Sequence, residues 1–542
     1  MSDFSRRSVL KAASTLAVTG AAATAVGTAV PAAAASATFR HGIASGDPLP
    51  DGILLWTRVT PTKDAAPGRG RGPAVPVRYE LSTTADFRRV VTRGTVTTRA
   101  ERDYTVKADV RGLQPATNYF YRFISGKDQS PVGRTRTAPA VGAAVDLMRV
   151  GVVSCANLQA GYFSSYRPLA ARGDLDLVLH LGDYLYEYAP GEYQARDVVV
   201  RPHDPPVEMT TLEHYRRRHA QYKEDADLQA LHAAVPFVVT WDDHESTNDA
   251  WAGGAENHTE GAEGAWVDRR TFAMQAYAEW MPVRYEAGGQ LYRRLNFGTL
   301  ASISMLDLRS YRDQQAPSTT DPAIDDPDRS ITGEAQMEWL LDGLSTQEAQ
   351  WKLVGNPVMI TPVLFPPAMG SAATGAMEEL LGTTTVDGVP YNVDQWDGYT
   401  ADQSRVLRHL GDNSIKDTVF LTGDIHSGWA CDLPADRDTY PRTGVSVGTE
   451  LVCTSVTSDN LDDILRVPPR TASLSVEATF RASNPYVKYL DFDSHGYSVL
   501  EVRPQGVRMD WYVLSERTDP RATSALSQSF QVLAGTQKVT RV

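Results

Sequence analysis

The chain has 542 residues, of which 42 % are hydrophobic, and a formal net charge of −13. A chain of this length can hold more than one domain, and its apolar content excludes wholesale disorder. The acidic balance argues against nucleic acid as the main partner, because nucleic-acid binding relies on excess basic charge. It is compatible with an exported protein that binds cations, and solubility alone accounts for it equally well.

Residues 1–37 have the pattern of a targeting segment. Arg6 and Arg7 precede a stretch rich in Ala, Thr and Val, and residues 33–37 contain two overlapping A-x-A cleavage sites. This pattern resembles a twin-arginine signal. The resemblance implies that the twin-arginine translocation machinery exports the folded protein, which is then secreted and either diffuses away or stays at the cell wall. The stretch is poor in Leu, so we do not expect stable membrane insertion.

Residues 38–138 are predicted to be all-β. Alternating or aromatic runs at residues 53–59, 77–82, 104–110 and 118–124 are separated by turn clusters. Short strands at this spacing favour a β-sandwich, and residues 113–119 resemble the turn before a late strand of fibronectin type III domains. We therefore expect an N-terminal β-sandwich domain of the fibronectin III or immunoglobulin type, followed by a linker at residues 139–144.

From residue 145 to the end of the chain, apolar strands alternate with amphipathic helices, which predicts a layered α/β domain. The expected helices are residues 211–219, 266–280, 334–344 and 401–410, and a hairpin is expected at residues 497–513. The expected strands are residues 148–154, 175–181, 237–241, 301–306, 351–356, 419–422 and 451–454. Residues 365–390 are rich in Gly, Ala, Pro and Thr and are predicted to form a wall or lid with one short helical piece.

The chain has three cysteines, and an odd number in an exported protein leaves at least one unpaired or acting as a ligand. Cys431 and Cys453 could form a disulfide or lie in the core as free thiols. The sequence leaves both alternatives open.

The residues that follow these strands include many metal-ligand types. Ligands bind beyond the carboxyl ends of the strands in open α/β sheets, so these positions predict a site. In chain order they are Cys155 and Asn157; Asp183 and Tyr186; Asp242, Asp243, His244 and Glu245; Asp307 and Arg309; Asn356; Asp424 and His426. Asp183 is the strongest candidate, because an acid that closes an apolar strand is costly without a partner. Asp307 and Arg309 are also compatible with a purely structural pair.

These motifs resemble those of the calcineurin-like metallophosphoesterases. Residues 182–186 contain Gly-Asp-x-x-Tyr in full, residues 242–245 stand for G-N-H-E/D, and residues 423–426 stand for G-H-x-H. The chain departs from the pattern at Cys155, which replaces an acid, and at Asn356, which replaces a lone His. Asn356 precedes a proline, so a turn-forming role remains open.

The departures are similar to those of one branch of that group, the PhoD-type alkaline phosphatases. Shared motifs are Ser-Cys-Ala-Asn at residues 154–157, Leu-Gly-Asp-Tyr-x-Tyr-Glu-Tyr at 181–188, Trp-Asp-Asp-His-Glu at 241–245 and Thr-Gly-Asp-Ile-His-Ser at 422–427. The likeness covers essentially the whole chain. It implies a layered β-sandwich flanked by helices, and phosphomonoesterase activity, often with phosphodiesterase activity, that depends on Fe³⁺ and Ca²⁺.

The resemblance also implies two ligand sets. Sulfur, oxygen and nitrogen donors suit Fe³⁺, and the expected set is Cys155, Asp183, Tyr186 and His426. Oxygen donors suit Ca²⁺, and the expected set is Asp183, Asp243, Asn356 and Asp424, with Asp183 as the bridge. Asp242 is a candidate for an additional Ca²⁺, and His426 could bind phosphate directly.

The expected mechanism places two cations on the phosphoryl oxygens while a metal-activated oxygen attacks phosphorus in line. His244 would bind the phosphate or protonate the leaving oxygen. Arg269 or Arg270 would clamp phosphate oxygens, with Arg269 preferred, and Asn157 would donate a hydrogen bond to phosphate.

The leading hypothesis is therefore a secreted, metal-dependent alkaline phosphatase and phosphodiesterase that hydrolyses phosphate esters for phosphate acquisition. One alternative is a diesterase for phospholipids or wall polymers on the same scaffold. Another is a non-catalytic wall-binding protein, which would not need the ligand residues that are present. A serine or cysteine hydrolase is not supported, because the Ser164-Ser165 pair lacks a nucleophile-elbow context and Cys155 has no clear His partner.

Overall fold

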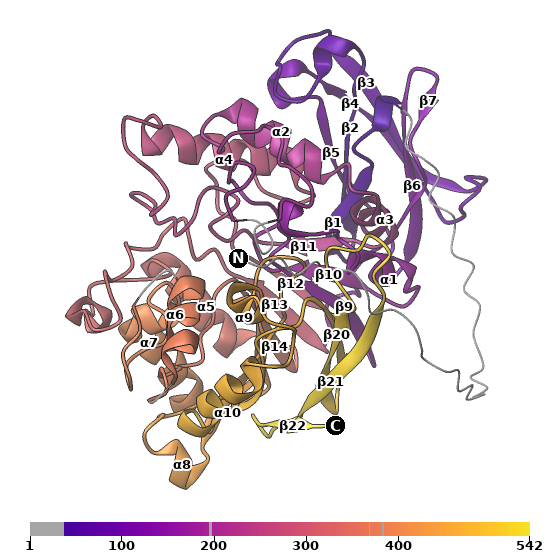
Figure 1. Ribbon diagram of the computed structural model, residues 1–542. Helices are drawn as coiled ribbons and strands as arrows, with labels where there is room; N and C mark the ends of the chain where they lie inside the picture. The colour runs from indigo at the N-terminus through magenta and orange to yellow at the C-terminus, as the bar shows by residue number, and fades with distance from the viewer. Residues whose placement is uncertain (1–36, 194–197, 368, 382–383) are drawn as a thin grey trace, which may run out of the picture. The chain divides into compact units, whose positions relative to one another are not determined.

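The computed structural model describes residues 37–193, 198–367, 369–381 and 384–542 (Figure 1). The described residues form a mixed α/β structure, as the sequence predicts, with three β-sheets. Of the predicted signal, residues 1–37, all but Ala37 lie outside the described residues. In the described part of the chain, no helix combines the length and apolar character that crossing a membrane requires.

The largest sheet has ten strands in the order β22-β21-β20-β19-β9-β10-β11-β1-β2-β5. Strands β9, β10 and β11 at its centre are parallel, and parallel strands covered on both faces are expected to be apolar throughout. The strands are β1 (Ile43–Leu49), β2 (Gly52–Arg58), β5 (Thr105–Arg111), β9 (Met148–Val153), β10 (Leu177–His180), β11 (Phe237–Val239), β19 (Gly496–Arg503), β20 (Gly506–Leu514), β21 (Ser524–Leu533) and β22 (Val539–Arg541).

The second sheet has seven strands in the order β12-β13-β14-β15-β17-β16-β18. Strands β13, β14, β15 and β17 are parallel to one another. The strands are β12 (Arg293–Phe297), β13 (Ala301–Met305), β14 (Trp351–Asn356), β15 (Thr418–Thr422), β16 (Gly428–Pro434), β17 (Ser446–Val452) and β18 (Val487–Asp491).

The two large sheets share one hydrophobic core. Val150 and Leu179 from the ten-stranded sheet belong to the same buried cluster as Ile303, Leu353 and Leu421 from the seven-stranded sheet. Each such side chain contributes roughly 1.5–3 kcal/mol when fully buried. Just beyond this core, a parallel bridge links residues 154 and 455, which follow β9 and β17. The carboxyl ends of parallel strands from both sheets therefore lie close together.

Helices flank these sheets (Figure 1). The four helices predicted from the sequence correspond to α2, α4, α5 and α7, and α6 is the helical piece predicted between residues 365 and 390. The α-helices are α1 (Tyr166–Ala171), α2 (Leu212–Tyr222), α3 (Ala226–Ala234), α4 (Trp266–Trp280), α5 (Glu334–Thr346), α6 (Ser371–Leu381), α7 (Thr400–Asp412), α8 (Tyr440–Thr443), α9 (Leu461–Leu465) and α10 (Ser473–Ser483). Short 3₁₀ turns are η1 (Ala37–Phe39), η2 (Lys63–Ala65), η3 (Ala100–Arg102), η4 (Leu158–Ala160), η5 (Pro322–Asp325) and η6 (Trp396–Gly398).

The N-terminal strands divide between two sheets. A third sheet contains β3 (Val75–Ser82), β4 (Val90–Thr98), β6 (Asn118–Ser125) and β7 (Asp128–Gln129), and β8 (Gly133–Arg136) pairs with β6. Strands β1, β2 and β5 instead extend the ten-stranded sheet, because β1 pairs in parallel with β11 through Gly46 and Phe237. A separate core that includes Ile53, Val77 and Tyr121 packs between these strands.

The C-terminal residues complete the opposite side of the ten-stranded sheet. The predicted hairpin at residues 497–513 is present as β19 and β20, and β19 pairs antiparallel with β9. Strands β21 and β22 continue the meander. Strand β21 was not predicted from the sequence, because only two of its ten side chains are buried and it therefore lacks a strong apolar signal.

Candidate metal centre

The predicted ligands other than Asn356 occupy loops that follow parallel strands of both large sheets. They are Cys155 after β9, Asp183 and Tyr186 after β10, Asp243 after β11, and Asp424 and His426 after β15, and the predicted phosphate-binding residue His244 follows Asp243. The carboxyl ends of parallel strands meet at one edge, so this arrangement brings four loops toward a common point.

The backbone at this point is unusual. Cys155, Asp183, Asp424 and His426 have φ angles of 57°, 53°, 68° and 50°, respectively. Non-glycine residues rarely adopt this left-handed conformation, which costs about 1–3 kcal/mol each and is concentrated at functional sites. Four strained residues in three loops indicate that the surrounding fold holds these side chains in place.

Gly182 allows two of the loops to approach each other. Its φ is 109°, and a Cβ atom built on it would lie 2.5 Å from the Cβ atom of Asp242. Any larger residue would push the loop that carries Asp183 away from the loop that carries Asp242. This glycine is therefore required by both its conformation and its packing.

Four predicted ligands come together in one group. The potential ligand atoms of Cys155, Asp183 and His426 all lie within 4.8 Å of one another. The Tyr186 hydroxyl donates to Asp183 Oδ2 at 3.1 Å and lies 3.3 Å from His426 Nε2. Sulfur, carboxylate, phenol and imidazole donors therefore converge on a single point.

Asp183 also belongs to two further groups. Its potential ligand atoms lie within 4.8 Å of those of Asp243 and His244 in one group, and of Asp242 and Asp424 in the other. Asp183 is buried, and its Oδ1 has no hydrogen-bond partner among the described residues. A buried carboxylate oxygen without a donor is costly, and an added cation would satisfy it. The chain therefore fits a centre of two or more cations that share Asp183.

The electrostatics of the protein alone leave much of this acidic charge uncompensated. Burial raises the pKa of Asp183 and Asp424 well above the usual range. Burial and the neighbouring Asp243 also raise the pKa of Asp242 to about 6, even though Arg309 opposes that shift. Several carboxyl groups that resist ionisation together are typical of a site completed by cations.

Arg309, one of the candidate residues that follow the predicted strands, is a member of this cluster, although the sequence did not show which acids it contacts. Its Nε donates to Asp242 Oδ1 at 2.6 Å, and its terminal nitrogens form a bidentate pair with Asp394 at 2.9 and 2.7 Å. The predicted pairing with Asp307 reduces to a backbone contact, in which the Arg309 amide donates to Asp307 Oδ1 at 3.2 Å. Asp394 follows no strand, so the rule about strand ends could not find it.

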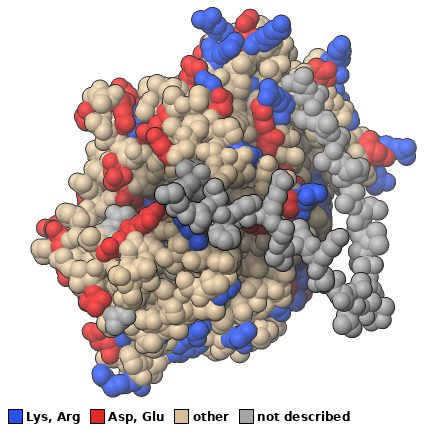
Figure 2. Space-filling model, in the orientation of Figure 1, with Lys and Arg blue, Asp and Glu red and all other residues tan. Residues whose placement is uncertain are grey.

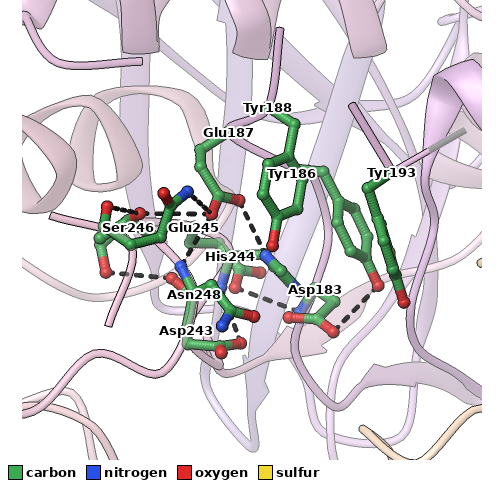
Figure 3. Close-up of polar contacts among 12 residues, drawn as sticks. Asp183, Tyr186, Glu187, Tyr188, Tyr193, Asp243, His244, Glu245, Ser246 and Asn248 are labelled. Atoms are coloured by element: carbon green, nitrogen blue, oxygen red, sulfur yellow. Dashed lines mark hydrogen bonds and ion pairs between the residues drawn. The ribbon is translucent and has the colours of Figure 1, made fainter. Parts of the chain in front are cut away.

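His244 is oriented by a second acid. Its Nδ1 lies 2.8 Å from Glu187 Oε2, and Glu187 Oε1 accepts a hydrogen bond from the Asn248 amide at 2.8 Å (Figure 3). Burial opposes protonation, but Asp243, Glu187 and Asp183 together raise the pKa of His244 well above its usual value. Such a carboxylate–imidazole pair fixes the ring and favours the protonated form. Glu187 lies one residue beyond Tyr186 in the motif at residues 181–188, but no role was assigned to it from the sequence.

Glu245 ties two of the ligand loops together. Its carboxylate accepts hydrogen bonds from the backbone amides of Asp183, Tyr184 and Asp242 at 3.1, 2.7 and 2.9 Å. Its position is therefore structural, behind the ligands.

Asn157 does not reach the cluster through its side chain. Its Nδ2 donates to the Tyr193 carbonyl at 2.8 Å, and its Oδ1 caps η4 by accepting from the Gln159 amide. Both polar atoms of the side-chain amide therefore contact backbone groups, and one of the two Nδ2 hydrogens is left over from these contacts. The direct phosphate contact expected for Asn157 stays a prediction.

Arg269 is engaged by acids outside the cluster, whereas Arg270 lines a pocket together with Asp242 and Arg309. Arg269 is buried and pairs with Glu208 at 2.5 Å and Glu263 at 3.1 Å. Arg270 donates to the Ser310 carbonyl at 2.8 Å. The helix position made both arginines plausible, but the spacing did not show that acids would hold the preferred one.

Asn356 lies in a separate buried network. Its Oδ1 accepts from Trp396 Nε1 at 3.1 Å, and its Nδ2 donates to the Val358 carbonyl at 2.5 Å and to Thr422 Oγ1 at 3.2 Å. An amide oxygen that already accepts from an indole is poorly placed as a ligand. Its expected role in the oxygen-only set is therefore not supported by its contacts.

The cysteines outside the centre are free. Cys431 and Cys453 are buried and unpaired, as is Cys155. The disulfide that the sequence left open is absent, and both residues pack in the core.

Comparisons with known proteins agree with this arrangement of motifs. The family described as PhoD-like phosphatase matches residues 150–511, and the N-terminal domain of PhoD-like phosphatases matches residues 22–139. The chain belongs to the PhoD-like phosphatase family. Membership of this family makes the protein a phosphoric ester hydrolase.

Two PhoD relatives cover nearly the whole chain. Alkaline phosphatase D of Bacillus subtilis (strain 168) is 37 % identical over 511 residues, which are 91 % of this chain and 80 % of that protein. A solved structure of PhoD is 35 % identical and superposes with a TM-score of 0.83, covering 94 % of this chain and 92 % of that chain. The fold described above is therefore that of PhoD.

In the view of Figure 2, basic and acidic side chains are interspersed over the described surface.

Proposed function

We propose that this PhoD relative is an exported alkaline phosphatase and phosphodiesterase that hydrolyses phosphate mono- and diesters for phosphate acquisition. The observation that carries the proposal is the position of Asp183, a buried carboxylate that belongs to three potential ligand groups and has one oxygen without a donor. The name of the Bacillus subtilis relative, alkaline phosphatase D, supports the reaction class.

We propose Fe³⁺ and Ca²⁺ as the cations. Cys155, Asp183, Tyr186 and His426 would hold Fe³⁺, because thiolate, phenolate and imidazole donors suit it. Asp183, Asp243 and Asp424 would hold Ca²⁺ through oxygen. Asp242, whose Oδ2 lacks a hydrogen-bond partner among the described residues, is the candidate for an additional Ca²⁺. When bound, such cations would neutralise phosphoryl oxygens and activate the attacking oxygen.

The protein's own groups would prepare the substrate. His244 is held at Nδ1 by Glu187, and its Nε2 makes no hydrogen bond to another residue in the described ranges. We therefore assign His244 Nε2 as the donor of a proton to the leaving oxygen. Arg309 offsets the charges of Asp242 and Asp394, which keeps the acidic cluster from repelling an anionic ester.

We further propose the finer fold assignment expected from the sequence. Residues 38–138 would be an N-terminal β-sandwich domain of the fibronectin III or immunoglobulin type, and residues 145–542 a layered metallophosphoesterase domain. The separate family matches to residues 22–139 and 150–511 support this division, as does the separate hydrophobic core of the N-terminal strands.

We also propose export by the twin-arginine machinery, on the basis of Arg6 and Arg7 and the A-x-A sites at residues 33–37. Replacing both arginines by lysine should retain the protein inside the cell. Fractionation of cells that express the two forms would show this directly, and equal secretion of the variant would contradict the assignment.

The first test of the activity is hydrolysis of p-nitrophenyl phosphate and bis-p-nitrophenyl phosphate at alkaline pH with Ca²⁺. Turnover of either ester would support the proposal, and the ratio of the two rates would define the balance of mono- and diesterase activity. Failure on both esters, with iron and calcium present, would favour the alternative of a phospholipid- or wall-polymer-directed diesterase.

A further inference from the structure

Tyr193 lies beside the metal centre and has no role in the assignments above. Its ring stacks on Tyr186, with centroids 5.8 Å apart and planes at 22°, and lies 6.1 Å from the ring of His244. The hydroxyl groups of Tyr186 and Tyr193 point the same way (Figure 3). Tyr193 is 38 % exposed, so one face covers the centre while the other meets solvent.

The backbone of Tyr193 is held by buried side chains that follow β9. Asn157 Nδ2 donates to the Tyr193 carbonyl at 2.8 Å. Gln159 Oε1 accepts from the Gly191 amide at 3.1 Å, and Gln159 Nε2 donates to the Glu192 carbonyl. Asn157 and Gln159 are each 0 % exposed. The fold therefore specifies the position of Tyr193.

The tautomer of His426 leaves the Tyr193 proton available. His426 Nδ1 lies 2.8 Å from the Asp459 carbonyl oxygen and 3.3 Å from the Tyr193 hydroxyl. A carbonyl oxygen only accepts, so Nδ1 must carry the hydrogen and Nε2 faces Tyr186. A protonated Nδ1 cannot accept from Tyr193. Within the described part of the chain, the Tyr193 hydroxyl has no other hydrogen-bond contact.

We propose that Tyr193 is a substrate-binding residue whose hydroxyl donates a hydrogen bond to a non-bridging oxygen of the phosphoryl group. This inference rests on the proposed function, because it requires a phosphate group at the Asp183 cluster. A neutral hydroxyl donor pairs well with an anionic oxygen. It also adds no positive charge beside His426.

The test compares the full-length, metal-loaded protein with Tyr193→Phe, which removes the hydroxyl and keeps the ring. We expect orthophosphate inhibition to weaken about 10- to 100-fold and kcat/KM for p-nitrophenyl phosphate to fall by a similar factor, as for loss of a hydrogen bond to a charged group. Metal content and the unfolding temperature should stay unchanged. Tyr79→Phe on β3, in the N-terminal sheet, is the matched control.

Two results would overturn the inference. Unchanged orthophosphate inhibition and kcat/KM in Tyr193→Phe would show that the hydroxyl does not contact substrate. Loss of iron in this variant would make Tyr193 a support for the ligands instead.

Calorimetric titration of both proteins with orthophosphate keeps this test separate from the proposed function. Wild-type protein without turnover of either ester would count against the proposed function. If Tyr193→Phe binds orthophosphate more weakly than the wild type does, the role of Tyr193 would still be supported. Equal orthophosphate affinity of the two proteins would refute that role.

Discussion

At the scale of single residues, Asp183 combines a left-handed backbone, a buried side chain and membership of all three potential ligand groups found in the described part of the chain. Asp183→Asn preserves its size but removes the charge that would join two cations. We expect activity to fall by at least about 10²–10³-fold, while the fold is retained because one of several mutually repelling buried acids is lost. Ester turnover, circular dichroism and metal analysis would check this. Near-normal turnover would refute the central role of Asp183.

Glu187 acts through His244, and its substitution should reveal this role by substrate dependence. Glu187→Gln weakens the contact that raises the pKa of His244 and fixes its ring. We expect kcat to fall about 10- to 100-fold for an alkyl phosphate, a share of the usual effect of general acid catalysis. The loss should be much smaller for p-nitrophenyl phosphate, whose leaving oxygen needs no proton.

The matched control for that prediction is Glu208→Gln, which removes an acid that pairs with Arg269 instead. It should affect both substrates equally. An equal loss on both substrates in Glu187→Gln would indicate a purely structural role for Glu187.

At the scale of elements, the site depends on how loops are fastened together. The Glu245 carboxylate accepts hydrogen bonds from three backbone amides. In Glu245→Gln, the side-chain NH₂ group would face at least one of these N–H donors and could not accept its hydrogen bond. We expect a loss of roughly 1–3 kcal/mol in the free energy of unfolding, together with weaker metal retention. Urea unfolding and metal analysis after dialysis would measure both. Glu334→Gln, at an exposed pair with Arg405, should change neither.

The loops that the sequence could place are those that follow strongly apolar strands. Buried strands can be recognised in the sequence by their continuous apolar residues. Because the carboxyl ends of parallel strands lie at one edge, the convergence of Cys155, Asp183, Asp424 and His426 was predictable. The direction of a side chain within a loop was not. Asn157 satisfies backbone groups instead of facing the cluster.

The same limit applies to partners that come from distant segments. Arg269 forms ion pairs with acids at residues 208 and 263, and Asn356 accepts a hydrogen bond from the indole of Trp396. Such contacts cannot be predicted from a local sequence pattern, because the partners are far apart in the sequence. For the fold, strands within residues 38–138 could be predicted from the sequence, but the pairing of Gly46 with Phe237 could not.

At the scale of the whole molecule, Lys107 joins the N-terminal strands to the catalytic part. On β5, its Nζ donates to the carbonyls of Ala278 and Tyr285 at 2.9 and 3.1 Å. Burial lowers its pKa to about 8, against about 10.4 in an unfolded chain. The native state therefore binds fewer protons than the unfolded state between these values, and this contribution to stability grows as the pH rises from 8 to 10.

Lys107→Met removes that titration. We expect the stability difference between wild type and this variant, measured by urea unfolding, to increase in favour of the wild type between pH 8 and 10. The increase should be about 1.4 kcal/mol per pH unit at most. The exposed Lys416, changed to Met, supplies the control. A difference that does not vary with pH would contradict this prediction.

The order in which the ten-stranded sheet can be completed follows from its connectivity. Strand β9 (Met148–Val153) receives its outer neighbour only from β19 (Gly496–Arg503), more than three hundred residues later. A nascent chain that does not yet include β19 would leave one side of β9 as an open strand edge, and such edges can pair with other chains and cause aggregation. Contacts so distant in sequence also slow folding. During its synthesis, the protein must therefore keep one edge of a central strand unpaired until the chain has been made as far as β19.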